Sequence, residues 1–300
     1  MRFPLAMVLT IFFILSTVWA DAQKLPVMVS ILPQKYFVQQ VGKELVEVKV
    51  MVSPGSNPAT YEPSPQKMVA LSKSELYFSI GVPFEKAWLE RFKSANPDIS
   101  IIPTQSGINK KPISAHSSFM GPEQKAKSEH KKPKKHAVQD PHIWLVPDLV
   151  KIQAQNILKG LIKKDPRHTE DYKENFQSFI RQLDDLDNSL KEIFSSIPAD
   201  KRRFMVFHPS WGYFASAYGL TQIAIEVKGK EPSPKELMHL ITFARQKDIQ
   251  VIFIQPQFSQ KSARAIARQL KAKVITLDPL ASNWKDNLLK VAETFENILH

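Results

Sequence analysis

Three side chains that could bind a metal ion lie in separate loops of the sequence. His142 stands in the segment DPHIWLVP, His208 in FHPSWGYFA and Asp278 in LDPLA. Two imidazoles and one carboxylate form a ligand set that suits zinc, and less favourably manganese or iron. The sequence contains no cysteine, so thiolate ligands are excluded and any metal ion must be held by nitrogen and oxygen donors.

Each of these residues also has a purely structural interpretation. A histidine in a loop flanked by proline can simply form a turn or a local hydrogen bond, and Asp278 before Pro279 could form an Asx turn. Asp140, which precedes Pro141, is interpreted as such a turn. A metal site is therefore favoured only if the fold brings the three side chains to one place.

The elements that would position these residues are strands alternating with helices. Eight short apolar runs predict strands at residues 26–31, 46–52, 76–80, 99–102, 204–207, 222–227, 251–254 and 274–277, and helical patterns follow most of them. This alternation is typical of parallel α/β sheets, whose ligands bind beyond the carboxyl ends of the strands. Four strands precede residue 110 and four follow residue 200, so we predict two α/β lobes of parallel sheet. His208 and Asp278 directly follow strands of the second lobe.

A long helix is predicted between the lobes. Residues 169–194 carry apolar side chains at spacings of three and four, which places them on one stripe of a helix. A coiled-coil arm is the alternative, but fewer than four heptads are present. We predict an N-terminal lobe at residues 23–165, a linking helix at 166–196 and a C-terminal lobe at 197–300.

The amino-terminal segment has the pattern of a secretory signal peptide. Residues 1–22 combine an early arginine, a short apolar run and small residues near Ala20 and Ala22. An uncleaved membrane anchor is the alternative, but the apolar run is shorter than a bilayer requires. Since no cysteine follows the leader, a lipid anchor is excluded. We expect a periplasmic protein that is secreted through its signal peptide and is not a lipoprotein.

The positive charge is concentrated in one segment. The chain has 41 Lys and Arg against 29 Asp and Glu, a formal net charge of +12. Residues 109–136 hold eight lysines, two glutamates and three histidines without apolar periodicity, which predicts a flexible loop. Export, and the absence of aromatic residues interleaved with the lysines, argue against a nucleic-acid partner. The loop should mildly repel a bare cation, and an anionic chelate or acidic partner stays open.

Several motifs together resemble one protein family. DPHIWLVP, FHPSWGYFASAYGL, VKGKEPSPKEL with VIFIQPQFS, and LDPLA are similar to motifs of the periplasmic zinc- and manganese-binding proteins that serve ABC importers. The resemblance runs from about residue 25 to the C-terminus. It implies two α/β lobes joined by one long helix, a divalent metal ion in the cleft, a membrane permease as partner and a monomeric chain. It also implies that His142 and His208 are ligands and that Asp278 stands where many members supply a carboxylate.

The sequence departs from the family pattern at a further ligand position. Members usually have a histidine in the loop after the second strand, in a pattern like P-H-x-Y-E-P, whereas this stretch reads PATYEP with Ala59 in that place. Water, Glu62 or a loop histidine such as His136 could fill the open position. Family members often have glutamate near Gln255, which is neutral here. The resulting expectation is a metal-capturing protein, most favourably for zinc.

Two further hypotheses follow from the missing histidine. The same fold could bind a metal chelate or a small anion attracted by the lysines. A zinc ion with an open position could also activate water, as in an enzyme. The enzyme hypothesis is disfavoured because HExxH is absent and no general base stands at motif spacing from these residues.

Overall fold

The computed structural model describes residues 24–113, 138–227 and 229–299 of the chain. The predicted signal peptide and most of the predicted lysine loop, including His116, His130 and His136, lie outside these residues. Within the described ranges, no helix combines the length and the apolar character needed to cross a membrane.

The N-terminal lobe contains a four-stranded parallel sheet in the order β2-β1-β3-β4. The strands are β1 (Leu25–Val29), β2 (Val46–Val50), β3 (Leu76–Ser79) and β4 (Ser100–Pro103). Helix α1 (Leu32–Gly42) follows β1, α2 (Pro65–Ser72) follows β2, and α3 (Glu85–Ala95) follows β3. The apolar runs of the sequence form the strands because parallel strands covered on both faces must be buried.

The C-terminal lobe repeats this arrangement with the order β6-β5-β7-β8, again all parallel. The strands are β5 (Arg203–Val206), β6 (Thr221–Ala224), β7 (Val251–Ile254) and β8 (Lys273–Thr276). Helix α7 (Gly212–Ala217) follows β5, α8 (Pro234–Gln246) follows β6, and α9 (Lys261–Leu270) follows β7. Ser233 caps α8 in a capping box with Glu236, which fixes where this helix begins.

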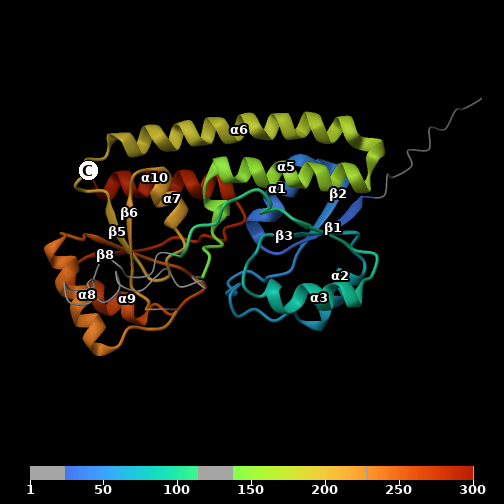
Figure 1. The fold of residues 1–300 in the computed structure, drawn as a ribbon. Coiled ribbons are helices and arrows are strands. Elements are labelled where there is room, and N and C mark those ends of the chain that lie inside the picture. Colours follow the sequence, from blue (N-terminus) through green and yellow to red (C-terminus); the bar gives the residue numbers. More distant parts are fainter. Residues whose placement is uncertain (1–23, 114–137, 228, 300) are drawn as a thin grey trace, which may run out of the picture.

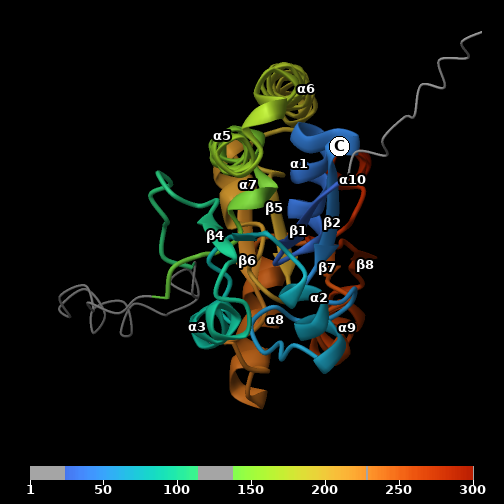
Figure 2. The ribbon, with the colours of Figure 1, turned by 90° about the vertical axis from the view of Figure 1, so that its right-hand side faces the viewer.

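A layer of three helices joins the lobes. The linking helix α6 (Thr169–Ser196) runs along the top of both lobes, and α5 (Pro147–Lys164) and α10 (Trp284–Leu299) lie beneath it (Figure 1). Figure 2 views α5 and α6 end-on and shows them stacked above the N-terminal sheet. Helix α6 buries its predicted apolar stripe, including Phe176, Leu183 and Leu190. The expected fold, two parallel α/β lobes joined by one long helix, is confirmed.

One hydrophobic core passes through both lobes. Its buried members include Val27 of β1, Phe179 of α6, Phe204 of β5 and Phe295 of α10. A second, smaller cluster lies in the C-terminal lobe against α8 and α9. The lobes therefore do not have fully separate cores, and the helix layer packs against both sheets.

A pair of tryptophans links the lobes below the candidate site. The indole N–H of Trp144 donates to the carbonyl of Pro279 at 2.7 Å, and that of Trp284 donates to the carbonyl of Trp144 at 2.7 Å. Both side chains are almost fully buried. The segment that carries His142 is thus fixed to the C-terminal part of the chain by buried hydrogen bonds, which cost more to break than exposed ones.

Candidate metal site

His142 is held in place by Asp140. It stands directly before the short turn Ile143–Leu145 that leads into α5, and its side chain is largely buried. The Asp140 carboxylate oxygen Oδ1 accepts a hydrogen bond from the backbone N–H of His142 at 2.9 Å and lies 2.6 Å from the ring Nδ1. Since a carboxylate only accepts, Nδ1 donates and Nε2 is left with its lone pair for a metal ion.

His208 is held by a different set of contacts in the C-terminal lobe, directly after β5. The Gln255 side chain accepts from the His208 backbone N–H at 3.1 Å and donates to its carbonyl at 2.6 Å. The ring of Phe258 stacks on the imidazole with centroids 4.4 Å apart. The amide at position 255 suits this loop, because a carboxylate there could not donate to the carbonyl.

A buried carboxylate also lies beside His208. Oε2 of Glu226 is 3.0 Å from the ring Nδ1, close enough for an ion pair. The two atoms are not aligned for a hydrogen bond, and this buried nitrogen has no hydrogen-bond partner among the described residues. A buried ring nitrogen without a partner calls for an explanation, and a rotation of the imidazole would let Nδ1 donate to Glu226 and leave Nε2 with its lone pair.

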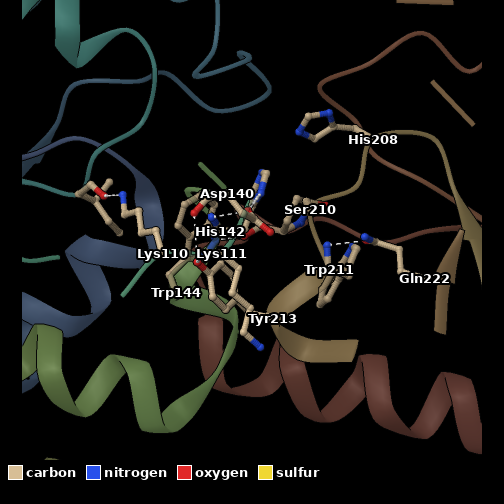
Figure 3. Close-up of polar contacts among 12 residues, drawn as sticks. Lys110, Lys111, Asp140, His142, Trp144, His208, Ser210, Trp211, Tyr213 and Gln222 are labelled. Carbon is tan, nitrogen blue, oxygen red and sulfur yellow. Dashed lines mark hydrogen bonds and ion pairs between the residues drawn. The ribbon is translucent and has the colours of Figure 1, made fainter. Parts of the chain in front are cut away.

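The fold brings the two histidines together from different lobes. Their ring centroids lie 5.2 Å apart with the planes at 66°. In Figure 3, Asp140 and His142 form a pair at the centre, and His208 extends from the neighbouring segment. The predicted convergence of these two imidazoles is therefore found, with a carboxylate beside each ring.

Burial determines the ionisation of His142. Loss of water lowers the pKa of its imidazole below the usual value, although hydrogen bonding and charge from Asp140 act in the opposite direction. A lowered pKa favours the neutral ring, which is the form that a metal ligand requires.

Asp278 has local contacts of its own. Its Oδ1 accepts from the side-chain amide of Gln257 at 2.6 Å and from the backbone N–H of Leu280 at 2.9 Å. The second contact is the Asx turn that the sequence left open as an alternative. Within the described ranges, no three His, Asp or Glu side chains stand close enough together to hold a metal ion. The two histidines are thus assembled, and Asp278 as a third ligand stays a prediction.

The position of the missing histidine is exposed. Ala59 lies in the loop after β2, and its backbone N–H donates to the Asn57 side chain at 2.8 Å. Glu62, which the sequence suggested as a replacement ligand, is exposed as well. His136, the other suggestion, lies outside the described residues. Among the described residues, neither suggested replacement is therefore placed beside the two imidazoles.

The base of the predicted lysine loop connects the two lobes beside His142. The Tyr213 hydroxyl of α7 accepts from the backbone N–H of Lys111 at 2.8 Å and donates to the Asp140 carbonyl at 3.3 Å. The Asp140 N–H in turn donates to the Lys111 carbonyl at 2.8 Å. A Cβ at Gly212 would lie 3.0 Å from Oδ2 of Asp140, so glycine permits this close approach. Figure 3 shows Tyr213 and Lys111 directly beside Asp140.

Two residues at the site were not identified as functional from the sequence. Asp140 was expected to form a turn, which it does, but it also orients the ring of His142. Glu226 was hidden inside a strand predicted to run to residue 227, whereas β6 ends at Ala224. With the correct strand end, Glu226 would have been found by the same search of loops at the carboxyl ends of strands.

This architecture, with imidazoles from two α/β lobes meeting below a long helix, defines a class of two-lobed metal-binding proteins that serve transporters. The chain belongs to the family described as zinc-uptake complex component A, periplasmic, whose model matches residues 27–299. A crystal structure of ZnuA is 41% identical and superposes with a TM-score of 0.82, covering 92% of this chain and all of that one. The family resemblance predicted from the motifs is confirmed. The family is one of solute-binding transport proteins.

Curated relatives carry names for different metals. The high-affinity zinc uptake protein ZnuA of Bacillus subtilis is 28% identical over 89% of this chain and 82% of its own length. The iron-binding protein YfeA of Yersinia pestis is 26% identical over 81% of this chain and 74% of its own length. A manganese transporter lipoprotein, PsaA of Streptococcus anginosus, is 26% identical, covering 85% of this chain and 84% of PsaA. Relatives thus bind zinc, manganese or iron.

Proposed function

We propose that this chain captures a divalent metal ion, zinc, between its two lobes outside the cytoplasm and delivers it to the membrane permease of an ABC transporter. The observation that carries the proposal is the pair His142 and His208, which come from different lobes and lie with ring centroids 5.2 Å apart. Two imidazoles favour zinc over manganese because nitrogen donors suit the softer ion. The description of the matching family as a zinc-uptake component supports the same choice.

The proposed ligands are His142, His208 and Asp278. Both contacts that fix the Asp278 carboxylate are made to Oδ1, which leaves Oδ2 available as a ligand atom. Three protein ligands leave a fourth position of a tetrahedral zinc ion for water or for a further side chain. In this proposal Asp140 and Glu226 act as positioning residues, because each lies beside the Nδ1 of one imidazole.

Calorimetry of the full mature chain tests this proposal. We expect one zinc ion per chain, tighter binding of zinc than of manganese, and loss of binding in His208→Ala. Unchanged zinc binding by His208→Ala would refute the site. Tighter binding of manganese or iron would support the proposed site but contradict zinc as the preferred metal.

The second candidate function is binding of a metal chelate or small anion in the same place. It is favoured by Ala59, because a histidine is missing where the family usually has one. It predicts that free zinc does not raise the melting temperature, whereas a chelated metal or an anionic metabolite does. The variant Ala59→His separates the two functions, since it should strengthen zinc binding by orders of magnitude if the natural site is a metal site lacking one ligand.

A further inference from the structure

The outer helix of the C-terminal lobe, α9, has an exposed face made of cations. Lys261, Arg264, Arg268 and Lys271 follow one another at spacings of three and four residues, and all four are exposed. We call these four residues the α9 stripe. The opposite face of the helix, with Ala263, Ile266 and Ala267, is buried against the sheet. Because 3.6 residues make a turn, Lys261, Arg264 and Arg268 lie on the same side of the helix, and Lys271 follows directly as the C-cap residue.

The charges of the α9 stripe are not neutralised by neighbours. None of its four cations forms an ion pair with a described residue, whereas lysines elsewhere, such as Lys151 and Lys191, do. The guanidinium of Arg264 donates to the neutral amide of Gln260. Glu231 lies near the start of the helix, where it accepts a hydrogen bond from the hydroxyl of Ser262. Arg245 of α8 adds a further cation, because it donates to the carbonyl of Gln269 at 3.1 Å.

We propose that the α9 stripe binds the anionic phospholipid headgroups of a membrane surface. Its chemistry fits a charged plane better than a protein pocket. Protein interfaces depend on buried aromatic and apolar anchors, and the exposed large apolar residues of the described chain, Val69, Val138, Ile152 and Met238, all lie outside α9. A row of long cationic side chains needs no shape complementarity, since its attraction acts over a Debye length of about 8 Å at physiological salt.

Such binding would concentrate the protein at the surface where a permease is found. Some relatives are named as lipoproteins, whereas this chain is expected to be exported without a lipid anchor. Electrostatic adsorption is reversible, so a loaded protein could still move along the membrane and leave it. The inference goes beyond the proposed function and does not depend on which metal is bound.

Flotation with lipid vesicles tests the proposal on the mature chain, with and without zinc. We expect binding to vesicles that contain phosphatidylglycerol, little binding to phosphatidylcholine alone, and loss of binding as salt rises. The double variant Arg264→Gln, Arg268→Gln should bind about thirtyfold more weakly, because each cation near an anionic surface is worth roughly a factor of five. Glutamine preserves helix propensity, so the fold should be kept.

The matched control is Lys159→Gln, Lys163→Gln. It removes the same charge at the same spacing from exposed positions of α5, which lies at the other end of the molecule (Figure 1). It should weaken binding much less. Equal weakening by both double variants would show that only the total charge matters and would overturn the proposal. Binding only to vesicles that carry a permease, or loss of binding only when the lysines of residues 114–136 are replaced, would overturn it too.

Discussion

At the scale of single residues, the two histidines differ in how firmly their rings are held. The Nδ1 of His142 lies 2.6 Å from Asp140, while the Nδ1 of His208 lies 3.0 Å from Glu226 without an aligned hydrogen bond. The ring of His142 is therefore held in one orientation. The ring of His208 is restrained by stacking on Phe258 and can still rotate toward a better position when a cation arrives.

We predict that Asp140→Asn weakens zinc binding by about 10-fold to 100-fold, the usual effect of losing a carboxylate behind a metal-bound histidine. The amide keeps the size of the side chain but no longer supplies the negative charge. Calorimetry with zinc gives the affinity, and the absorption spectrum of bound cobalt reports the ligand geometry. The matched control is Asp165→Asn, since Asp165 lies 2.6 Å from the Nδ1 of His168 outside the site. An equal loss of affinity in both variants would contradict the assigned role.

The lowered pKa of His142 predicts a pH dependence of the metal-free protein. The unfolded chain binds a proton at the usual histidine pKa of about 6.5, whereas burial lowers the pKa in the folded state. This residue therefore makes folding more favourable above about pH 6.5, and its contribution is lost as the pH falls through the folded pKa. Urea unfolding should show that the stability advantage of the wild type over His142→Gln shrinks on acidification. Parallel pH curves for the two proteins would contradict this.

At the scale of elements, Tyr213 of α7 links the C-terminal lobe to the segment that carries His142. Its hydroxyl contacts the chain on both sides of the loop, at Lys111 and at Asp140. We predict that Tyr213→Phe weakens zinc binding several-fold and speeds zinc release, since Asp140 loses part of its support. The measurement is stopped-flow release of zinc to a chelator.

Tyr218→Phe is the control for this prediction. Tyr218 also donates a hydrogen bond, to Asp187 at 2.8 Å, but away from the site. Both variants should lose stability by about 1 kcal/mol, as is typical of one hydrogen bond, and only Tyr213→Phe should change zinc release. If the two variants release zinc at the same rate, the role of Tyr213 is limited to stability.

Most of the helices and strands were predictable from the sequence, for physical reasons. The eight parallel strands appear as apolar runs, and the apolar stripe of α6 is long enough to identify the helix. The end of β6 was misplaced because Ile225 and Val227 continue its apolar pattern after the ladder has ended. Helix α7, with six residues, is too short to produce a periodic pattern. The contacts of Asp278 with Gln257 depend on loop geometry, which single-sequence patterns do not contain.

At the scale of the whole molecule, the two lobes are joined rigidly. The linking helix α6 has 28 residues, and one core passes through both lobes. Hinge closure is absorbed by a few loop or element-terminal residues, and a continuous helix and a shared core oppose such a movement. We therefore expect the radius of gyration from X-ray scattering to be nearly the same with and without zinc, and metal capture to depend on local loop movements near His208 and Asp278.

The hydrogen-bonded pair Trp144 and Trp284, here called the tryptophan seam, should affect zinc binding as well as stability. Trp284→Phe keeps the aromatic packing on Phe37 but removes the hydrogen bond to the Trp144 carbonyl. A buried acceptor left without a partner costs about 1–3 kcal/mol of unfolding free energy. Because Trp144 lies two residues after His142, zinc affinity should fall as well. Trp88→Phe, in α3 and away from the seam, is the control. If it lowers zinc affinity as much as Trp284→Phe, the tryptophan seam does not position His142.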